Sequence, residues 1–348
     1  MPFLRNAWYV AAWSDEVQVA PFHRTILNEP VLMYRKQSGE AIAMADRCAH
    51  RFAPLHLGKL IGDAIECPYH GLRYDSAGVC IFSPHGDGAL PKIARLKSYP
   101  MVERFGALWI WMGALEKADP AAIPDFSFLT DAAKYATVTG ASRIEANFEL
   151  IADNLMDLSH VSFLHAESFG GANIPRASLE VTEEGTMVQC KRLCVNDPAT
   201  PTLRAALNGY DKPLDFWLDM RWEPPSAMRL DIGVTPTGRP RSEGIHHLEP
   251  HLLTPETDMT THYFWGDSRP YLLNDSNVSG ALVKQLRQAF DNEDKPLIEA
   301  QQRMMGTTDL WSLHPALLEG DAGAVRVRQV LARLIAAERT AASSTVRA

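Results

Sequence analysis

The chain has 348 residues, 46% of them hydrophobic and 22% charged, which allows a sizeable core and excludes wholesale disorder. A formal net charge of −8 argues against a non-specific nucleic-acid binder, and no run of about 18 apolar residues predicts a membrane-spanning helix. Five cysteines in a chain of this length fit a reducing, cytoplasmic compartment better than a disulfide framework, and the first residues lack the pattern of a secretion signal.

Short β segments bounded by turn residues run through about the first 112 residues. The next stretch, to about residue 135, is rich in Ala, Pro and Asp, which is typical of a linker. We therefore predict a small all-β domain over residues 1–125.

The remainder of the chain mixes helices and strands, as the spacing of its apolar residues indicates. The expected strand regions are 178–194, 217–236 and 245–267, and the expected helical regions are 149–160, 277–304 and 322–340. The sequence thus predicts an α+β domain over residues 126–340 and a flexible tail over 341–348.

Two pairs of Cys and His lie on separate loops of the all-β part, Cys48-Ala49-His50 and Cys67-Pro68-Tyr69-His70. Two thiolates and two imidazoles can hold a structural zinc ion. They can also hold a Rieske [2Fe–2S] cluster, in which two Cys bind one iron and two His bind the other. Zinc fingers usually group Cys with Cys and His with His, whereas each loop here supplies one of each. The pattern therefore favours the dinuclear cluster.

The same loops carry a resemblance to a known family. The first loop, and the second with its continuation Gly71-Leu72, resemble the Rieske ferredoxin-like signature. The segments Asn6–Ala11 and His50–Leu55 are similar to the opening of Rieske non-haem iron oxygenases. Within that superfamily, the resemblance is to the oxygenase components of aryl O-demethylases, of the vanillate demethylase and dicamba monooxygenase type.

This resemblance implies a fold, cofactors and partners. Cys48, His50, Cys67 and His70 would bind the [2Fe–2S] cluster, and the second domain would hold a mononuclear Fe(II) on an antiparallel sheet of helix-grip type. Electrons would come from NADH through a separate reductase or ferredoxin, and O₂ would be the co-substrate. Family members of this type are ring trimers, so a homotrimer is expected.

The expected helix over 149–160 leads into two histidines, His160 and His165. Residues five apart lie about 140° apart around a regular helix, which is too far for both to bind one metal. We therefore predict a distortion of the helix over Ser159–Phe163. Two His and one carboxylate form the facial triad of non-haem Fe(II) oxygenases.

The third ligand of such a triad must come from elsewhere in the chain. Spacing alone leaves three candidates open, Asp291, Glu293 and Asp294, and any of them could instead cap a helix. The resemblance implies Asp294, because the segment Glu293–Lys295 aligns with the acidic ligand segment of the family. The two histidines and Asp294 are therefore the expected iron ligands.

Two polar residues precede His160 on the same helix face, Asn154 and Asp157. The resemblance implies that Asp157 is an inter-subunit electron bridge to His70 of a neighbouring subunit. We expect its carboxylate to bond the outer N–H of His160, which would fix the tautomer of that ring. Asn154 is expected near the open side of the iron, without being a ligand.

The substrate pocket is expected beside the strands of the second domain. Its wall is predicted to be one strand face, which carries Met228, Leu230, Ile232 and Val234. His246 and His247 point to opposite faces of their strand, so both cannot line one pocket. The resemblance implies that His251 is the pocket histidine that holds an acidic group of the substrate.

Two pocket positions depart from the dicamba monooxygenase pattern, since Leu230 and Gln285 stand where Asn and Trp are expected. This departure argues against dicamba itself as the substrate. Leu158 is a further pocket candidate. Four aromatic side chains are expected in the core, Phe216, Trp217, Phe264 and Trp265.

Motifs and resemblance together predict the terminal oxygenase component of a multicomponent Rieske monooxygenase. The expected reaction is O₂-dependent O-demethylation of a vanillate-like methoxylated aromatic acid, which gives a phenol and formaldehyde. Attack on another small aryl substrate, such as an aryl sulfonate methyl or an N-methyl group, is the alternative. A Rieske electron-transfer protein without catalysis is a third hypothesis, but it leaves the His160 and His165 pair without a use.

Overall fold

The computed structural model describes residues 3–90, 92–166, 169, 173–197, 207 and 210–345. The chain divides into two compact units. One consists of Arg5–Ile123 with Thr254–Thr257, and the other of Met1–Leu4, Pro124–Leu253 and Asp258–Ala348. The predicted domain limits, residues 1–125 and 126–340, stay predictions. A compact unit is not by itself shown to be a domain that folds independently.

The N-terminal unit consists of three small antiparallel sheets, in the strand orders β1-β11-β10, β2-β3-β4-β9 and β5-β6-β7-β8. The predicted all-β character is confirmed. The strands are β1 (Trp8–Trp13), β2 (Phe22–Ile26), β3 (Glu29–Arg35), β4 (Ala41–Ala45), β5 (Lys59–Ile61), β6 (Ala64–Glu66), β7 (Arg73–Tyr74), β8 (Cys80–Phe82), β9 (Ser98–Tyr99), β10 (Met101–Arg104) and β11 (Ala107–Trp111).

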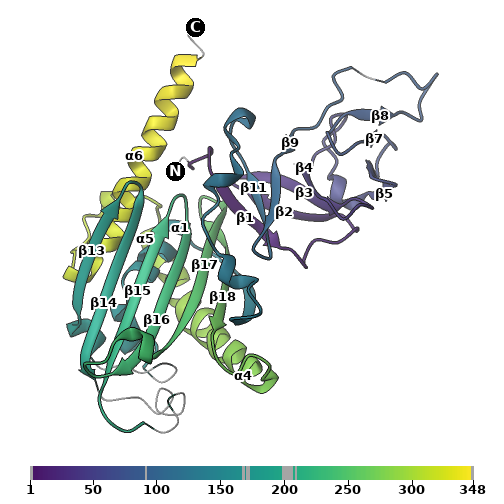
Figure 1. The fold of residues 1–348 in the computed structure, drawn as a ribbon. Coiled ribbons are helices and arrows are strands. Elements are labelled where there is room, and N and C mark those ends of the chain that lie inside the picture. The colour runs from purple at the N-terminus through teal and green to yellow at the C-terminus, as the bar shows by residue number, and fades with distance from the viewer. Residues whose placement is uncertain are drawn as a thin grey trace. The chain divides into compact units, whose positions relative to one another are not determined.

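The second unit is a seven-stranded antiparallel sheet in the order β12-β18-β17-β16-β15-β14-β13. Its helices lie against one side of this sheet (Figure 1). The strands are β12 (Ala136–Ile144), β13 (Ser178–Glu184), β14 (Met187–Asp197), β15 (Leu214–Glu223), β16 (Ala227–Pro236), β17 (Ile245–Thr257) and β18 (Thr260–Arg269). The helices are α1 (Phe148–Met156), α2 (Val161–Leu164), α4 (Ser276–Arg287), α5 (Lys295–Met305) and α6 (Ala322–Thr345).

Most expected elements of this unit are present, with three differences. The strand β12 was not predicted, because its apolar and polar residues do not alternate clearly. The expected helix over 277–304 is interrupted by a π-helix, Gln288–Asp294. The last helix runs to Thr345, into the expected tail over 341–348, of which residues 346–348 lie outside the described residues. In the part of the chain that the structure describes, no helix is long and apolar enough to cross a membrane.

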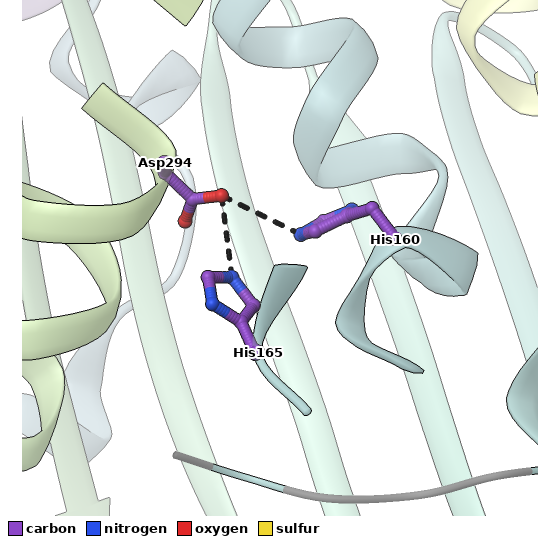
Figure 2. A group of neighbouring side chains, drawn as sticks. All are labelled: His160, His165 and Asp294. Carbon is purple, nitrogen blue, oxygen red and sulfur yellow. Dashed lines mark ion pairs between the residues drawn. The ribbon is translucent and has the colours of Figure 1, made fainter. Parts of the chain in front are cut away.

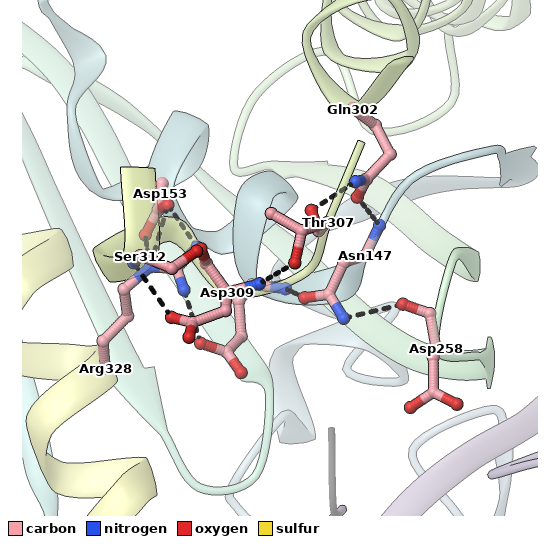
Figure 3. Close-up of polar contacts among 9 residues, drawn as sticks. Asn147, Asp153, Asp258, Gln302, Thr307, Asp309, Ser312 and Arg328 are labelled. Atoms are coloured by element: carbon pink, nitrogen blue, oxygen red, sulfur yellow. Dashed lines mark hydrogen bonds and ion pairs between the residues drawn. The ribbon is translucent and has the colours of Figure 1, made fainter. Parts of the chain in front are cut away.

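A buried polar network fixes the start of α1, the helix that leads to the histidine pair (Figure 3). Asn147 caps this helix by accepting a hydrogen bond from Glu149 N at 2.9 Å. Its side-chain amide donates to Asp258 O at 2.8 Å, and its backbone N–H donates to Gln302 Oε1 at 2.9 Å. An Asn cap satisfies helix N–H groups that have no partner within the helix.

An arginine of α6 also binds helix α1 through two of its carboxylates. The guanidinium of Arg328 donates to Glu149 and to Asp153, each at 2.7 Å, and its side chain is only 4% exposed (Figure 3). A buried charge must be paired, so these three residues depend on one another.

Replacing Arg328 by Met will therefore leave two carboxylates of α1 without their cation. We expect the free energy of unfolding in urea to fall by about 3–5 kcal/mol. The matched control is Arg333→Met on the same helix, which breaks a pair with Glu183 in which the arginine is 58% exposed, and which should cost less than about 1 kcal/mol. Equal losses for the two variants would contradict the structural role of the buried pair.

Candidate metal centres and active site

Two loops of the N-terminal unit turn in the same way. Cys48 N donates to Ala53 O at 2.9 Å, and Cys67 N donates to Leu72 O at 2.8 Å. In the second loop, Gly71 adopts a φ of +71°, the left-handed region that glycine reaches without strain. The two loops thus present their Cys and His residues in parallel ways.

These loops place sulfur inside and nitrogen outside. Cys48 and Cys67 are 1% and 2% exposed, whereas His50 is exposed and His70 is half-buried. The two imidazole rings lie with their centroids 4.6 Å apart. This donor set fits a [2Fe–2S] cluster, in which the two thiolates would hold one iron and the two imidazoles the other.

In the second unit, the backbone changes direction between α1 and the second histidine. The helix ends at Met156, a single 3₁₀ turn spans Leu158–His160, and α2 follows. The carboxylate of Asp157 accepts a hydrogen bond from Ser159 N at 3.1 Å and so caps the short turn. The predicted distortion is confirmed, although it begins before Ser159.

This break brings His160 and His165 to one carboxylate (Figure 2). Asp294 Oδ1 lies 3.2 Å from Nε2 of His165 and 3.7 Å from Nε2 of His160. Asp294 is the last residue of the π-helix and is 5% exposed. The ligand atoms of the three residues all lie within 4.8 Å of one another, so one metal ion could contact all of them.

The outer nitrogens of both rings are occupied. His160 Nδ1 lies 2.7 Å from the backbone carbonyl of Asp157, and His165 Nδ1 lies 2.5 Å from Glu293 Oε2. Such contacts leave each Nε2 free to bind a metal. The expectation that the Asp157 carboxylate bonds His160 is wrong, because the backbone oxygen takes that position.

The surroundings of the two histidine rings also shift their pKa values. Burial lowers the pKa of His160. Burial also acts to lower the pKa of His165, but Asp294 and Glu293 outweigh it and raise that pKa. A carboxylate on each side of His165 therefore stabilises the positive charge that a bound metal ion would replace.

The Asp157 carboxylate points elsewhere. It lies 2.5 Å from Nη2 of Arg192 and accepts from Ser159 Oγ at 3.0 Å. It also lines a surface hollow of about 840 Å³, beside the exposed apolar side chains of Phe163 and Leu318. A Cβ on Gly320 would lie 2.5 Å from the Asp157 carboxylate, so a larger residue at that wall would displace this carboxylate.

A cavity of about 800 Å³ opens between the histidine pair and the sheet. Its walls are mostly apolar, and the polar groups are concentrated near the triad and on β17. The lining residues are Asn154, Leu155, Leu158, His160, Val161, His165, Phe169, Phe216, Leu218, Leu230, Ile232, Glu249, His251, Gln285, Phe290 and Asp294.

Comparison with known proteins places this geometry in a family. Residues 144–337 match the vanillate O-demethylase oxygenase C-terminal domain, and residues 7–100 match the Rieske [2Fe–2S] domain. The oxygenase component of dicamba O-demethylase from Stenotrophomonas maltophilia is 40% identical over 334 residues, which cover 96% of this chain and 98% of that protein.

The chain is an oxygenase component of the Rieske O-demethylase family.

Further relatives agree with this assignment. The vanillate O-demethylase oxygenase subunit of Pseudomonas sp. (strain HR199 / DSM 7063) is 34% identical, over 99% of this chain and 98% of its own. The crystal structure of dicamba monooxygenase bound to 3,6 dichlorosalicylic acid superposes with a TM-score of 0.93 at 39% identity, covering 97% of this chain and 99% of that chain. The protein is thus a Rieske non-haem iron monooxygenase component, with a [2Fe–2S] cluster and a mononuclear iron as cofactors.

The cavity of this oxygenase component contains most, but not all, of the expected pocket residues. Leu158, Leu230, His251 and Gln285 line it. Met228 does not line it, although it is paired with His251 between β16 and β17, and it is fully buried. Val234 is also absent from the lining, since it packs with Leu214 in a separate apolar cluster.

Other differences concern aromatic and acidic residues. Phe216 lines the cavity, whereas Trp217, Phe264 and Trp265 lie in the core as expected. The contact of Glu293 with His165 was not foreseen. Glu249 was missed entirely, although it lies two residues from His251 and therefore on the same strand face.

His251 presents an unpaired nitrogen in this cavity. Its Nδ1 lies 2.6 Å from the Tyr263 hydroxyl, while its buried Nε2 has no hydrogen-bond partner among the described residues. Burial lowers the pKa of His251 to about 3, so the ring is neutral at physiological pH. When Nδ1 accepts the Tyr263 proton, Nε2–H is a donor available to a substrate oxygen.

The strand that follows the second Rieske loop, β7, contains a residue that should tune the potential of the cluster. The Tyr74 hydroxyl lies 3.3 Å from Cys48 Sγ. Hydrogen bonds to the sulfurs raise the reduction potential, because they stabilise the more negative reduced cluster. We expect Tyr74→Phe to lower the midpoint potential by roughly 20–60 mV, the equivalent of one hydrogen bond for a one-electron couple. Potentiometric titration followed by EPR measures it, with Tyr69→Phe as the exposed control, and an unchanged potential would remove Tyr74 from this role.

Proposed function

We propose that this oxygenase component removes the methyl group of a vanillate-like methoxylated aromatic acid, giving a phenol and formaldehyde. The observation that carries the proposal is the triad of His160, His165 and Asp294, which opens on a mainly apolar cavity of about 800 Å³. The oxygenase components of dicamba and vanillate O-demethylases, which are similar along almost their whole length, support O-demethylation as the reaction type.

The donor set of the triad fits non-haem iron, and the three residues are proposed as its ligands. Two Nε2 atoms and one carboxylate converge, and both outer nitrogens are held in place. Iron, when bound, supplies the oxygen chemistry, whereas the chain supplies geometry and a dry pocket. Cys48, His50, Cys67 and His70 are likewise proposed as the cluster ligands.

The cavity supports a small aromatic substrate with one polar end. Phe169, Phe216 and Phe290 provide aromatic surface. His251 offers a donor for an oxygen of the acidic group, in a lining whose described residues include no Lys or Arg. Leu230 contributes an apolar wall near the ring. Asn154 donates to Asp294 Oδ1 at 3.3 Å, which supports its place beside the metal rather than as a ligand.

The surface hollow at Asp157 supports an inter-subunit electron path. A negative side chain with exposed apolar neighbours is a suitable docking point for the His70 loop of a second copy. We propose a cyclic homotrimer with such contacts, and electron delivery from NADH by a separate reductase or ferredoxin. The cytoplasmic location stays a prediction that rests on cysteine usage.

A substrate panel tests the proposed reaction. The reconstituted enzyme, with a flavin reductase and NADH, should couple O₂ uptake to formaldehyde release with vanillate and related methoxybenzoates, and much less with the matched methoxybenzenes that lack the carboxyl group. Formaldehyde from N-methyl compounds alone, or an alcohol product from the methyl group of an aryl sulfonate alone, would replace the proposed substrate class. The absence of O₂ uptake with every methyl compound would overturn the O-demethylase proposal.

A further inference from the structure

A row of four polar side chains leads away from the cavity wall. Glu249 lines the cavity, and His247 lies two residues earlier on the same face of β17. Asp267 belongs to the adjacent strand β18, and Tyr271 follows that strand. None of these four residues is used by the proposed ligand set.

The inner part of this row consists of two neighbouring carboxyl groups. Asp267 is completely buried, and its Oδ1 has no hydrogen-bond partner among the described residues. Glu249 lies on the adjacent strand β17, close enough to Asp267 for the one carboxyl group to act on the other. Burial raises the pKa of Glu249 well above its ordinary value, and Asp267 adds to this effect. A proton on Glu249 supplies the missing donor, because two ionised carboxylates cannot share a dry site.

The outer part of the row reaches solvent. His247 Nδ1 lies 2.6 Å from Asp267 Oδ2, and its Nε2 lies 2.8 Å from the Tyr271 hydroxyl. The His247 side chain is 21% exposed, in contrast to the buried Asp267. An imidazole with both nitrogens engaged can accept a proton on one side and release one on the other.

We propose that Tyr271, His247, Asp267 and Glu249 form a proton relay between solvent and the active-site cavity. Oxidative O-demethylation takes up two protons and two electrons for each O₂, and yields the phenol, formaldehyde and water. The electrons come from the reductase, and the relay supplies the protons. Tyr271 passes its hydroxyl proton to Nε2 of His247 and regains one from solvent, and His247 passes its Nδ1 proton to Asp267. Glu249 releases its own proton into the cavity and is reprotonated from Asp267.

The surroundings of Glu249 favour transfer along this row. The other titratable groups that face it are His251, whose Nε2 lies 3.7 Å away, and Tyr263. His251 is neutral and Tyr263 keeps its proton, because burial raises the pKa of Tyr263 well above its usual range. Both groups are also buried, whereas the His247 side chain is 21% exposed, so of these three only His247 connects the row to solvent.

Glu249→Gln and His247→Gln test the relay, with His246→Gln as the matched control on the opposite strand face. With vanillate as the probe, we expect both relay variants to bind substrate and both metal centres normally and to turn over roughly 10²-fold more slowly, as loss of a general acid predicts. Their rates should fall further as pH rises, because protons must then come directly from solvent, whereas wild type and His246→Gln stay flat near neutral pH. Wild-type rates and pH profiles in both relay variants would overturn the relay.

A second measurement needs no substrate or turnover. Burial raises the pKa of Glu149 to about 7, so that residue also contributes a protonated carboxyl group, and wild type and Glu249→Gln are therefore compared by infrared difference spectroscopy of the holoenzyme. The difference spectrum should contain the C=O band of a buried protonated carboxyl group, and the absence of that band would overturn the shared proton and the relay with it. If wild type fails to demethylate vanillate, the proposed substrate fails, and the relay variants are then compared on the panel compound that wild type turns over.

Discussion

His160→Ala should abolish turnover while leaving the Rieske spectrum intact. The variant removes one of three protein ligands at the proposed iron site, whose ligand atoms lie within 4.8 Å of one another, and nothing near the Cys loops. The iron content should fall by about one of three atoms per chain, with acid-labile sulfide unchanged. Metal analysis, EPR of the reduced cluster and formaldehyde release measure these three quantities.

His246→Ala is the control for this experiment. Its ring lies 3.4 Å from Asp231 on the far face of the sheet and does not line the cavity. It should keep both metal centres and near wild-type turnover. If His160→Ala retains the third iron and demethylates at the wild-type rate, the assignment of the triad is wrong.

Asp157→Asn should slow re-oxidation of the pre-reduced cluster by orders of magnitude, with both metal sites filled. The substitution is nearly isosteric, but it removes the charge that faces the surface hollow. The carbonyl contact to His160 involves the backbone and is retained, so the tautomer of that ring should not change. A single-turnover experiment, in which vanillate and O₂ are added to the reduced enzyme, gives the rate.

The structure makes a second variant necessary, because Asp157 also pairs with Arg192, whose side chain is 4% exposed. Asn at position 157 leaves this buried cation without its carboxylate, which could distort the turn before His160. Arg192→Gln separates the two effects, since it breaks the pair and keeps the carboxylate. Equal slowing in both variants would mean that Asp157 acts only through the fold, and a wild-type rate in Asp157→Asn would remove the bridging role.

The oligomeric state provides an independent check on the same proposal. A monomer that is fully active in dilute solution would exclude an inter-subunit path. Sedimentation of the holoenzyme at assay concentration measures it, and a trimer is expected.

The sequence was sufficient wherever the geometry of a single helix or strand decides the directions of its side chains. Two histidines five residues apart cannot meet on a regular helix, so the break before His165 was predictable without knowledge of its neighbours. The alternation of His246 and His247 similarly excluded a shared pocket. Both inferences depend only on the periodicity of one element.

Residues that act across elements could not be placed in this way. Spacing left Asp291, Glu293 and Asp294 open, and although the family resemblance implied Asp294, the physical difference between the three lies in their packing. Asp291 accepts a hydrogen bond from Ser142 on β12, Glu293 holds the outer nitrogen of His165, and Asp294 faces the inner nitrogens. Their side chains differ in direction because of a π-helix, which no sequence period announced.

The cavity shows the same limit. A strand face was predicted correctly, but where the cavity stops along that face depends on what covers it. Leu230 and Ile232 meet the cavity, whereas Met228 lies opposite His251, whose ring packs against Phe290. Where the cavity ends along β16 therefore depends on how several elements pack together, and the sequence of one strand does not reveal it.

The π-helix over Gln288–Asp294 makes the triad sensitive to the winding of the helix as well as to its composition. A π-helix accommodates more residues per turn than an α-helix, as if an insertion had been absorbed without breaking the helix. If the same seven residues wound as a regular α-helix, everything after them would rotate by about 100° relative to α4, the angle of one residue. Asp294 would then turn away from both imidazoles although every side chain of the triad is still encoded. In this enzyme, metal affinity thus depends on a local helix type that changes no ligand.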